Sequence, residues 1–317
     1  MRPIKFVNGV IALLLLILVS ACAPRSEPVI SEGPSLPATA EETAEPAITE
    51  EATEPAATSD ASAEAQFPDF DPGNFKNSTV IDNEWVAMQP GSKWVYEGTA
   101  LDDAGKKIDR RIEFTVTDLT KEIEGVRTVV AWIEDFTDGE LGEKEVAFFA
   151  QDDSGNVWYF GEHPEDFENG KFIEAPTWIA GFQDAKPGIV MMAKPQLGMA
   201  NVYQGWGPEV GWSDYGRVEQ MGQDVCVPVD CYKNVLMNAE ASLAEPGAFQ
   251  LKYYVSGVGE IKIGWRGDDP TQEQLELIEY KQLTPEELAD IHAQSLELEK
   301  HAYEVSPDSY GKTTPMQ

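Results

Sequence analysis

The stretch IDRRIEFTVTD at residues 108–118 decides the fold. Ile112, Phe114 and Val116 alternate with polar residues at 113, 115 and 117. This period of two is typical of a β-strand with one face in a core and the other in water. Similar runs on either side, separated by Asp- and Gly-rich turns, predict strands at residues 93–99, 108–118, 126–136, 144–151 and 156–161. The predicted arrangement is an antiparallel meander.

Further strands are expected at residues 217–223, 232–241, 250–255, 260–265 and 275–280. Residues 146–149 and 157–160 are apolar at both parities, which indicates strands covered on both faces. No strand alternates with a helix, so a parallel α/β sheet is not expected. The predicted class is mainly β, in which the meander forms a curved sheet, as a half-open barrel or a two-layer β structure, with one C-terminal helix.

That helix is predicted from its first turn. Thr284 supplies an N-cap, Pro285 occupies the first helical position and Glu287 the third, which together make a capping box.

The expected domain organisation is a signal peptide at residues 1–21, a tether at 22–66, a β-rich domain at 67–283, the amphipathic helix at 284–304 and a flexible tail at 305–317.

The N-terminus has the order of an export signal. Arg2 and Lys5 precede an apolar run at residues 6–19, and Ser20 and Ala21 stand directly before Cys22. This order resembles the lipobox of bacterial lipoprotein precursors, which implies cleavage before Cys22 and its acylation. The alternatives are an ordinary signal peptide or an uncleaved anchor. We expect an exported protein, lipid-anchored to the cell membrane at the cell surface or in the periplasm.

The tether is rich in Ala, Pro, Thr, Ser and Glu and carries almost no aromatic residues. Such a composition cannot bury a core and predicts a disordered acidic spacer. The whole chain has 56 acidic and 23 basic residues and a formal net charge of −33. This charge excludes nucleic acid as a partner, because nucleic-acid binding depends on Lys and Arg. The same negative charge disfavours adsorption to anionic lipids, so the acyl group, and not electrostatics, would hold the protein at the membrane.

Two cysteines remain after Cys22, namely Cys226 and Cys231, which enclose four residues. In an exported protein this spacing favours a disulfide across a tight turn. The alternative is a redox or metal-binding pair, although a redox motif normally has two intervening residues.

No motif for a nucleophile, a phosphate-binding loop or a zinc site is present. The histidines at 163, 292 and 301 have poor spacing for ligation and are predicted to be solvated. The sequence therefore predicts no catalytic residue, metal ligand or cofactor, and it favours a protein that is not an enzyme. Two unassigned carboxylates could still form an acid and base pair.

Aromatic residues crowd the segment between residues 178 and 215, which Gly and Pro interrupt. Aromatic side chains on loops suit an apolar or carbohydrate site, so we predict ligand-binding candidates there. The alternative is that they close one end of the sheet as core. The candidates are Trp178, Phe182, Tyr203, Trp206, Trp212 and Tyr215.

Four stretches carry a family resemblance: PGSKWVYE at residues 90–97, AQDDSGNVWYFGE at 150–162, KPGIVM at 186–191 and KYYVSGVG at 252–259. They are similar to a family of uncharacterised bacterial lipoproteins and secreted proteins. The resemblance covers most of residues 85–280 and implies no activity, cofactor or catalytic residue.

A looser analogy is to envelope carriers with a curved sheet around an apolar cavity. The leading hypothesis is a non-catalytic binding domain for an apolar ligand, a glycan or an envelope partner protein. The alternatives are a hydrolase acting on envelope polymer through a carboxylate pair, and a structural or assembly spacer.

Overall fold

The computed structural model describes residues 64–317. The predicted signal peptide, Cys22 and nearly all of the tether lie outside the described residues. Within the described part, the main element is one antiparallel sheet of 15 strands. The predicted mainly β class, with a curved antiparallel sheet and one C-terminal helix, is confirmed.

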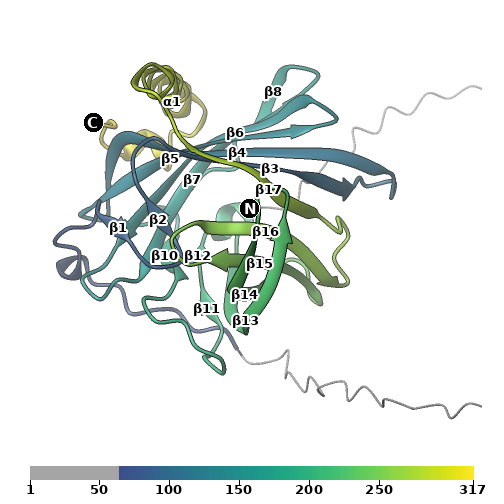
Figure 1. The fold of residues 1–317 in the computed structure, drawn as a ribbon. Coiled ribbons are helices and arrows are strands. Elements are labelled where there is room, and N and C mark those ends of the chain that lie inside the picture. The colour runs from purple at the N-terminus through teal and green to yellow at the C-terminus, as the bar shows by residue number, and fades with distance from the viewer. Residues whose placement is uncertain (1–63) are drawn as a thin grey trace, which may run out of the picture. The chain divides into compact units, whose positions relative to one another are not determined.

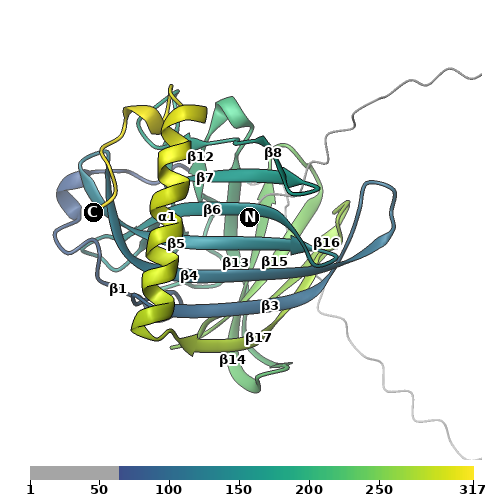
Figure 2. The same ribbon diagram turned by 90° about the horizontal axis from the view of Figure 1, so that it is seen from above.

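One part of the sheet is a layer of long, curved strands (Figures 1 and 2). Each strand pairs with the next along the chain, as the predicted meander requires. The strands are β3 (Ser92–Leu101), β4 (Lys107–Ile123), β5 (Val126–Thr137), β6 (Glu140–Gln151) and β7 (Val157–Glu168).

The later strands form a second layer, which passes beneath the first in Figure 1. They are β13 (Asp214–Val227), β14 (Asp230–Ser242), β15 (Ala248–Val255), β16 (Gly259–Gly267) and β17 (Gln274–Gln282). Strand β17 pairs with β3 and so joins the two layers into one sheet.

Short elements complete the described chain. They are β1 (Ile81–Asp82), β2 (Ala87–Met88), β8 (Lys171–Glu174), β9 (Trp178–Ile179), β10 (Lys186–Met191), β11 (Val202–Tyr203) and β12 (Gly205–Trp206), with the 3-10 turns η1 (Pro72–Asn74), η2 (Pro208–Val210) and η3 (Tyr310–Lys312). Strands β11 and β12 stand at the two ends of the strand order, yet only Gln204 separates them in the chain. The sheet therefore curls until its ends approach each other, without closing into a barrel.

Two separate cores explain why some strands carry apolar side chains on both faces of the sheet. On β5, Ala131 and Ile133 face the core between the two layers, whereas Val130 and Trp132 face a second core on the outer side of the long strands. Because successive side chains of a strand point to opposite faces, one strand can serve both cores.

Helix α1 (Pro285–Val305) covers the second core and lies across the long strands (Figure 2). It begins with the predicted capping box, in which the Thr284 side chain accepts from the Glu287 N–H and the Glu287 carboxylate accepts from the Thr284 N–H. Among the described residues, no helix is long and apolar enough to cross a membrane.

The C-terminal residues differ from the predicted flexible tail. Tyr310 is fully buried, Met316 is also buried, and the backbone of Gln317 exchanges two hydrogen bonds with that of Thr120. The tail returns to the sheet because these two apolar side chains complete the core under α1. The sequence carries no sign of this, because Tyr310 and Met316 stand among Pro, Ser and Gly residues and outside any helical or strand-like apolar pattern.

The prediction that His163 is solvated is wrong, because its side chain is fully buried on β7. Its Nδ1 lies 2.6 Å from Thr177 Oγ1, and this polar contact allows an imidazole to be placed in a core.

The disulfide prediction is confirmed, since Cys226 and Cys231 are bonded and face each other where β13 turns into β14.

Candidate functional site

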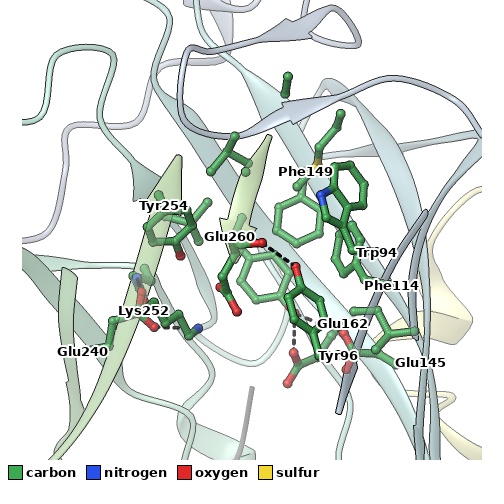
Figure 3. Close-up of a pocket in the computed structure, with 18 of the residues that line it drawn as sticks. Trp94, Tyr96, Phe114, Glu145, Phe149, Glu162, Glu240, Lys252, Tyr254 and Glu260 are labelled. Carbon is green, nitrogen blue, oxygen red and sulfur yellow. Dashed lines mark hydrogen bonds and ion pairs between the residues drawn. The ribbon is translucent and has the colours of Figure 1, made fainter. Parts of the chain in front are cut away.

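A cavity of about 170 Å³ lies between the two layers of the sheet. Figure 3 shows side chains from both layers pointing into it. Its wall is largely aromatic and aliphatic. The aromatic members are Trp94, Tyr96, Phe114, Phe149, Tyr159, Trp212 and Tyr254.

Strand register explains one side of the cavity. Trp94 on β3 stands opposite Phe114 on β4, which stands opposite Ile133 on β5, which stands opposite Glu145 on β6. All four line the cavity, because residues directly opposite one another on neighbouring strands share a face. An apolar row therefore ends at a carboxylate inside the molecule.

Glu145 and Glu162 form an acidic pair beside this row. The Tyr159 hydroxyl donates a hydrogen bond to Oε2 of Glu162 and lies 3.4 Å from Oε1 of Glu145. Tyr159 is itself held by ring stacking on Phe149, with 4.7 Å between the ring centroids. The two carboxylates are thus fixed around one hydroxyl at the edge of an aromatic wall.

The second layer contributes an ion pair. Lys252 Nζ lies 2.7 Å from Glu240 Oε2, and the Gln204 side-chain amide donates to Oε1 of the same carboxylate at 2.7 Å. Burial acts to lower the pKa of Lys252, but the nearby Glu240 and Glu260 outweigh it and raise this pKa above its ordinary value. Lys252 is therefore charged throughout the physiological range.

Glu260 lies opposite Tyr254 in the register of β15 and β16, and the two side chains are hydrogen-bonded. Burial raises the pKa of Glu260 to about 7, against the opposing effect of Lys252. Its backbone carbonyl accepts from the Tyr96 hydroxyl at 3.0 Å, an interaction drawn in Figure 3. This carboxylate titrates near neutral pH at the cavity wall.

A second row of carboxylates adjoins the cavity. Asp135, Glu143 and Asp166 stand directly opposite one another on β5, β6 and β7. Burial raises the pKa of Asp135 to about 7, and burial together with the neighbouring carboxylates raises that of Glu143 well above its ordinary value. Arg110 is ion-paired with Asp135. The interior next to the cavity is therefore acidic as well.

Two indoles stand beside the cavity with unused hydrogen-bond donors. Trp178 and Trp212 are stacked with their ring centroids 4.8 Å apart, and both are almost completely buried. Neither Nε1 atom has an acceptor among residues 64–317. Trp212 lines the cavity, whereas Trp178 does not.

The predicted ligand-binding residues are not brought together in one place. Trp212 lines the cavity and Trp178 stacks behind it, whereas Phe182 packs against the core under α1. The remaining three, Tyr203, Trp206 and Tyr215, form a separate aromatic group in which Tyr203 contacts the other two edge-on. The assignment of all six as ligand-binding residues stays a prediction.

Sequence reasoning missed the charged members of the wall, Glu145, Glu162, Glu240, Lys252 and Glu260. A signal was present, because a charged residue at an inward parity of an apolar strand is unusual. Glu145 shares its parity with Ala147 and Phe149, and Lys252 shares its parity with Tyr254. Among the described residues, no group of three or more His, Cys, Asp or Glu is placed to hold a metal ion.

No protein-family profile matches the chain, and no curated protein sequence matches it significantly. Two solved structures are similar in part. A protein from Parabacteroides distasonis ATCC 8503, predicted to be a lipoprotein, aligns with 65% of this chain and 100% of its own, at 11% identity and a TM-score of 0.33. A protein from Bacteroides fragilis NCTC 9343, predicted to be exported and described as having a YmcC-like fold, aligns with 63% of this chain and 99% of its own, at 10% identity and a TM-score of 0.33. Likenesses at this level carry no inference about function.

Proposed function

We propose that this chain is an exported, lipid-anchored binding protein whose β-domain holds a small, largely apolar molecule without transforming it. The observation that carries the proposal is the aromatic-walled cavity between the two layers of the sheet. Acylation of Cys22 would keep the domain at a membrane, where its ligand would be collected or delivered.

The size of the cavity limits the ligand. An apolar cavity of about 150 Å³ holds one benzene molecule. A cavity of about 170 Å³ therefore suits a ligand with one ring or a short aliphatic body, and not a long acyl chain. A few polar groups in an apolar pocket are the usual arrangement at a small-molecule site, and the charged side chains of the wall supply them here.

A filled cavity tests the proposal. Ala87 lines the cavity, so Ala87→Trp would place an indole inside it. Val80 is 58% exposed, and Val80→Trp adds the same indole to the surface as a matched control. The probe is 2-phenylethanol, added to the mature chain (residues 22–317) carrying Cys22→Ser, which prevents acylation.

At ten times its Kd, the probe should raise the Tm of the parent chain and of the control by about 3 to 5 °C. The Ala87→Trp chain should show no such shift. Equal shifts in all three chains, or no shift in the parent chain at saturating probe, would reject this cavity as a binding site.

One observation supports a second candidate, a hydrolase of envelope polysaccharide. Glu145 and Glu162 both contact the Tyr159 hydroxyl, so they are close enough to compare with the carboxyl pair of a retaining glycosidase, about 5 to 5.5 Å apart. The test is release of reducing ends from purified cell-wall polysaccharide. A hydrolase would release them and lose that activity on Glu162→Gln, whereas a binding protein would release none.

A further inference from the structure

We propose that Gln66 and Phe67 form a latch that keeps the cavity closed, and that release of this latch lets the ligand exchange. The inference rests on the proposed binding function and concerns how access to that same site is controlled. It follows from the way in which residues 202–206, here called the crossing segment, close the curled sheet beside the cavity.

The crossing segment bridges the two ends of the sheet. Its first two residues form β11 and pair with β13, and its last two form β12 and pair with β10. The long strands of the first layer, in contrast, pair with one another over most of their length. Segments held by few backbone hydrogen bonds open most readily, so we expect the crossing segment to open before the long strands do.

The crossing segment also belongs to the cavity wall. Gln204 lines the cavity, and its side-chain amide donates to Oε1 of Glu240 at 2.7 Å. The next residue, Gly205, lies against the wall residue Trp212, because a Cβ added to this glycine would be 2.8 Å from the Trp212 ring. Movement of the crossing segment would therefore displace one wall residue and remove the support of another.

Gln66 holds the first half of the crossing segment through its backbone. The Gln66 N–H donates to the Asn201 carbonyl at 2.9 Å, and the Tyr203 N–H donates to the Gln66 carbonyl at 3.0 Å. Gln66 thus forms a parallel bridge with Val202 on the side of β11 that faces away from β13. Loss of this bridge would remove the acceptor of the Tyr203 N–H and expose that edge of β11.

Phe67 holds both halves of the crossing segment at once. Its ring stacks on Tyr203 of β11, with 4.2 Å between the ring centroids, and meets Trp206 of β12 edge-on at 5.8 Å. Lys186 Nζ lies 4.5 Å from the centroid of the Phe67 ring, which adds a cation–π contact with β10. The Phe67 side chain is 42% exposed, so these contacts lie at the surface and can break while both cores stay packed.

The latch stands where the predicted tether joins the domain. Gln66 is the last residue of the predicted tether, and Phe67 is the first residue of the predicted β-rich domain. A force carried by the tether would therefore reach the latch before it reached the sheet. Ligand exchange would in this way depend on how the N-terminus is held.

Hydrogen exchange tests the latch without a ligand. In the mature chain with Cys22→Ser, Phe67→Ala should raise the exchange rate of the backbone N–H groups of the crossing segment about tenfold or more and leave those of β5 unchanged. Phe172→Ala is the matched control, because Phe172 is 37% exposed on β8 and should leave the crossing segment unchanged. Unchanged exchange of the crossing segment in Phe67→Ala would overturn the latch.

A backbone variant gives a second route to the same result. Gln66→Pro removes the N–H that donates to the Asn201 carbonyl, so it should accelerate exchange of the crossing segment as Phe67→Ala does. Ala65→Pro places the same ring one residue earlier and leaves the Gln66 N–H in place, so it should have no such effect. Equal exchange in the two proline variants would contradict a latch at Gln66.

The exchange kinetics of 2-phenylethanol test the link to the cavity. Stopped-flow tryptophan fluorescence should show association and dissociation rate constants about fivefold or more higher in Phe67→Ala, with Kd nearly unchanged, because the latch controls access and not the contacts of the bound molecule. Faster hydrogen exchange with unchanged probe kinetics would overturn the control of access and leave the binding function intact. Absence of probe binding by the parent chain would reject the binding function and the control of access, whereas hydrogen exchange would still decide whether the latch exists.

Discussion

Glu260→Gln should stabilise the domain at alkaline pH and leave its stability almost unchanged at acidic pH. Burial raises the pKa of Glu260 to about 7 from its ordinary value of 4.5, and the charged or titratable groups facing it are Tyr96, Glu240, Lys252 and Tyr254. The folded state therefore holds this proton more tightly than the unfolded state. The resulting stabilisation is complete below pH 4.5 and is lost as the pH rises through about 7. The difference between the two pKa values corresponds to about 3 kcal/mol. Allowing for partial solvent screening, we expect about 2 kcal/mol.

The assay is urea unfolding of the mature chain at pH 5.5 and at pH 8, with and without the substitution. At pH 8 the variant should exceed the parent chain by about 2 kcal/mol in unfolding free energy, and at pH 5.5 the two should differ by less than about 1 kcal/mol. The parent chain itself should lose stability over this range, because burial also raises the pKa of Asp135 to about 7 and that of Asp214 to about 6. A variant that is destabilised equally at both pH values would refute the reasoning, since Glu260 would then be stabilising as an ionised group.

Three further substitutions test contacts elsewhere in the domain. Lys121 is fully buried, and its Nζ lies 2.8 Å from Oε1 of Glu299. Lys121→Met should lower the free energy of urea unfolding by about 3 to 5 kcal/mol, because it leaves that carboxylate without its cation. Adding Glu299→Gln should recover part of the loss. Replacing both Cys226 and Cys231 by Ser should lower the free energy of unfolding by only about 2 kcal/mol, because the loop that the disulfide closes is short. Loss of the folded state on reduction of the disulfide would contradict this prediction. Gly205 has a φ of +155°, and a Cβ added there would lie 2.5 Å from the Trp178 ring and 2.8 Å from the Trp212 ring. Gly205→Ala should therefore destabilise the domain by about 2 kcal/mol and alter the near-ultraviolet circular dichroism of the two tryptophans.

The strands and the helix were predictable because their signals are local. Ile112, Phe114 and Val116 identify β4, and Thr284 with Glu287 identifies the start of α1. The end of β4 was placed at residue 118, five residues too early. A register shift between Val116 and Thr120 breaks the alternation there, after which the strand turns new apolar residues toward the core under α1. A sequence pattern of period two cannot follow a strand through such an irregularity.

The cavity was not predictable in the same way, because its charged residues come from separate strands. Glu145 and Glu162 belong to the first layer, whereas Glu240, Lys252 and Glu260 belong to the second. Only the pairing of β17 with β3 places the layers in one sheet, and this pairing has no local signal. The ligand-binding candidates were predicted in the aromatic segment between residues 178 and 215, and of these six residues only Trp212 lines the cavity.

The energetic cost of the charged wall is the main reason to connect it with function. Replacing a buried ionic group with apolar residues of similar volume is often neutral or stabilising, so an aromatic cavity needs no carboxylates in order to fold. Here four of them surround one cavity, and Glu260 is held where its ionisation near neutral pH opposes folding. Perturbed titratable groups of this kind concentrate at functional sites, because the interactions that destabilise the empty site are the ones that a ligand can satisfy.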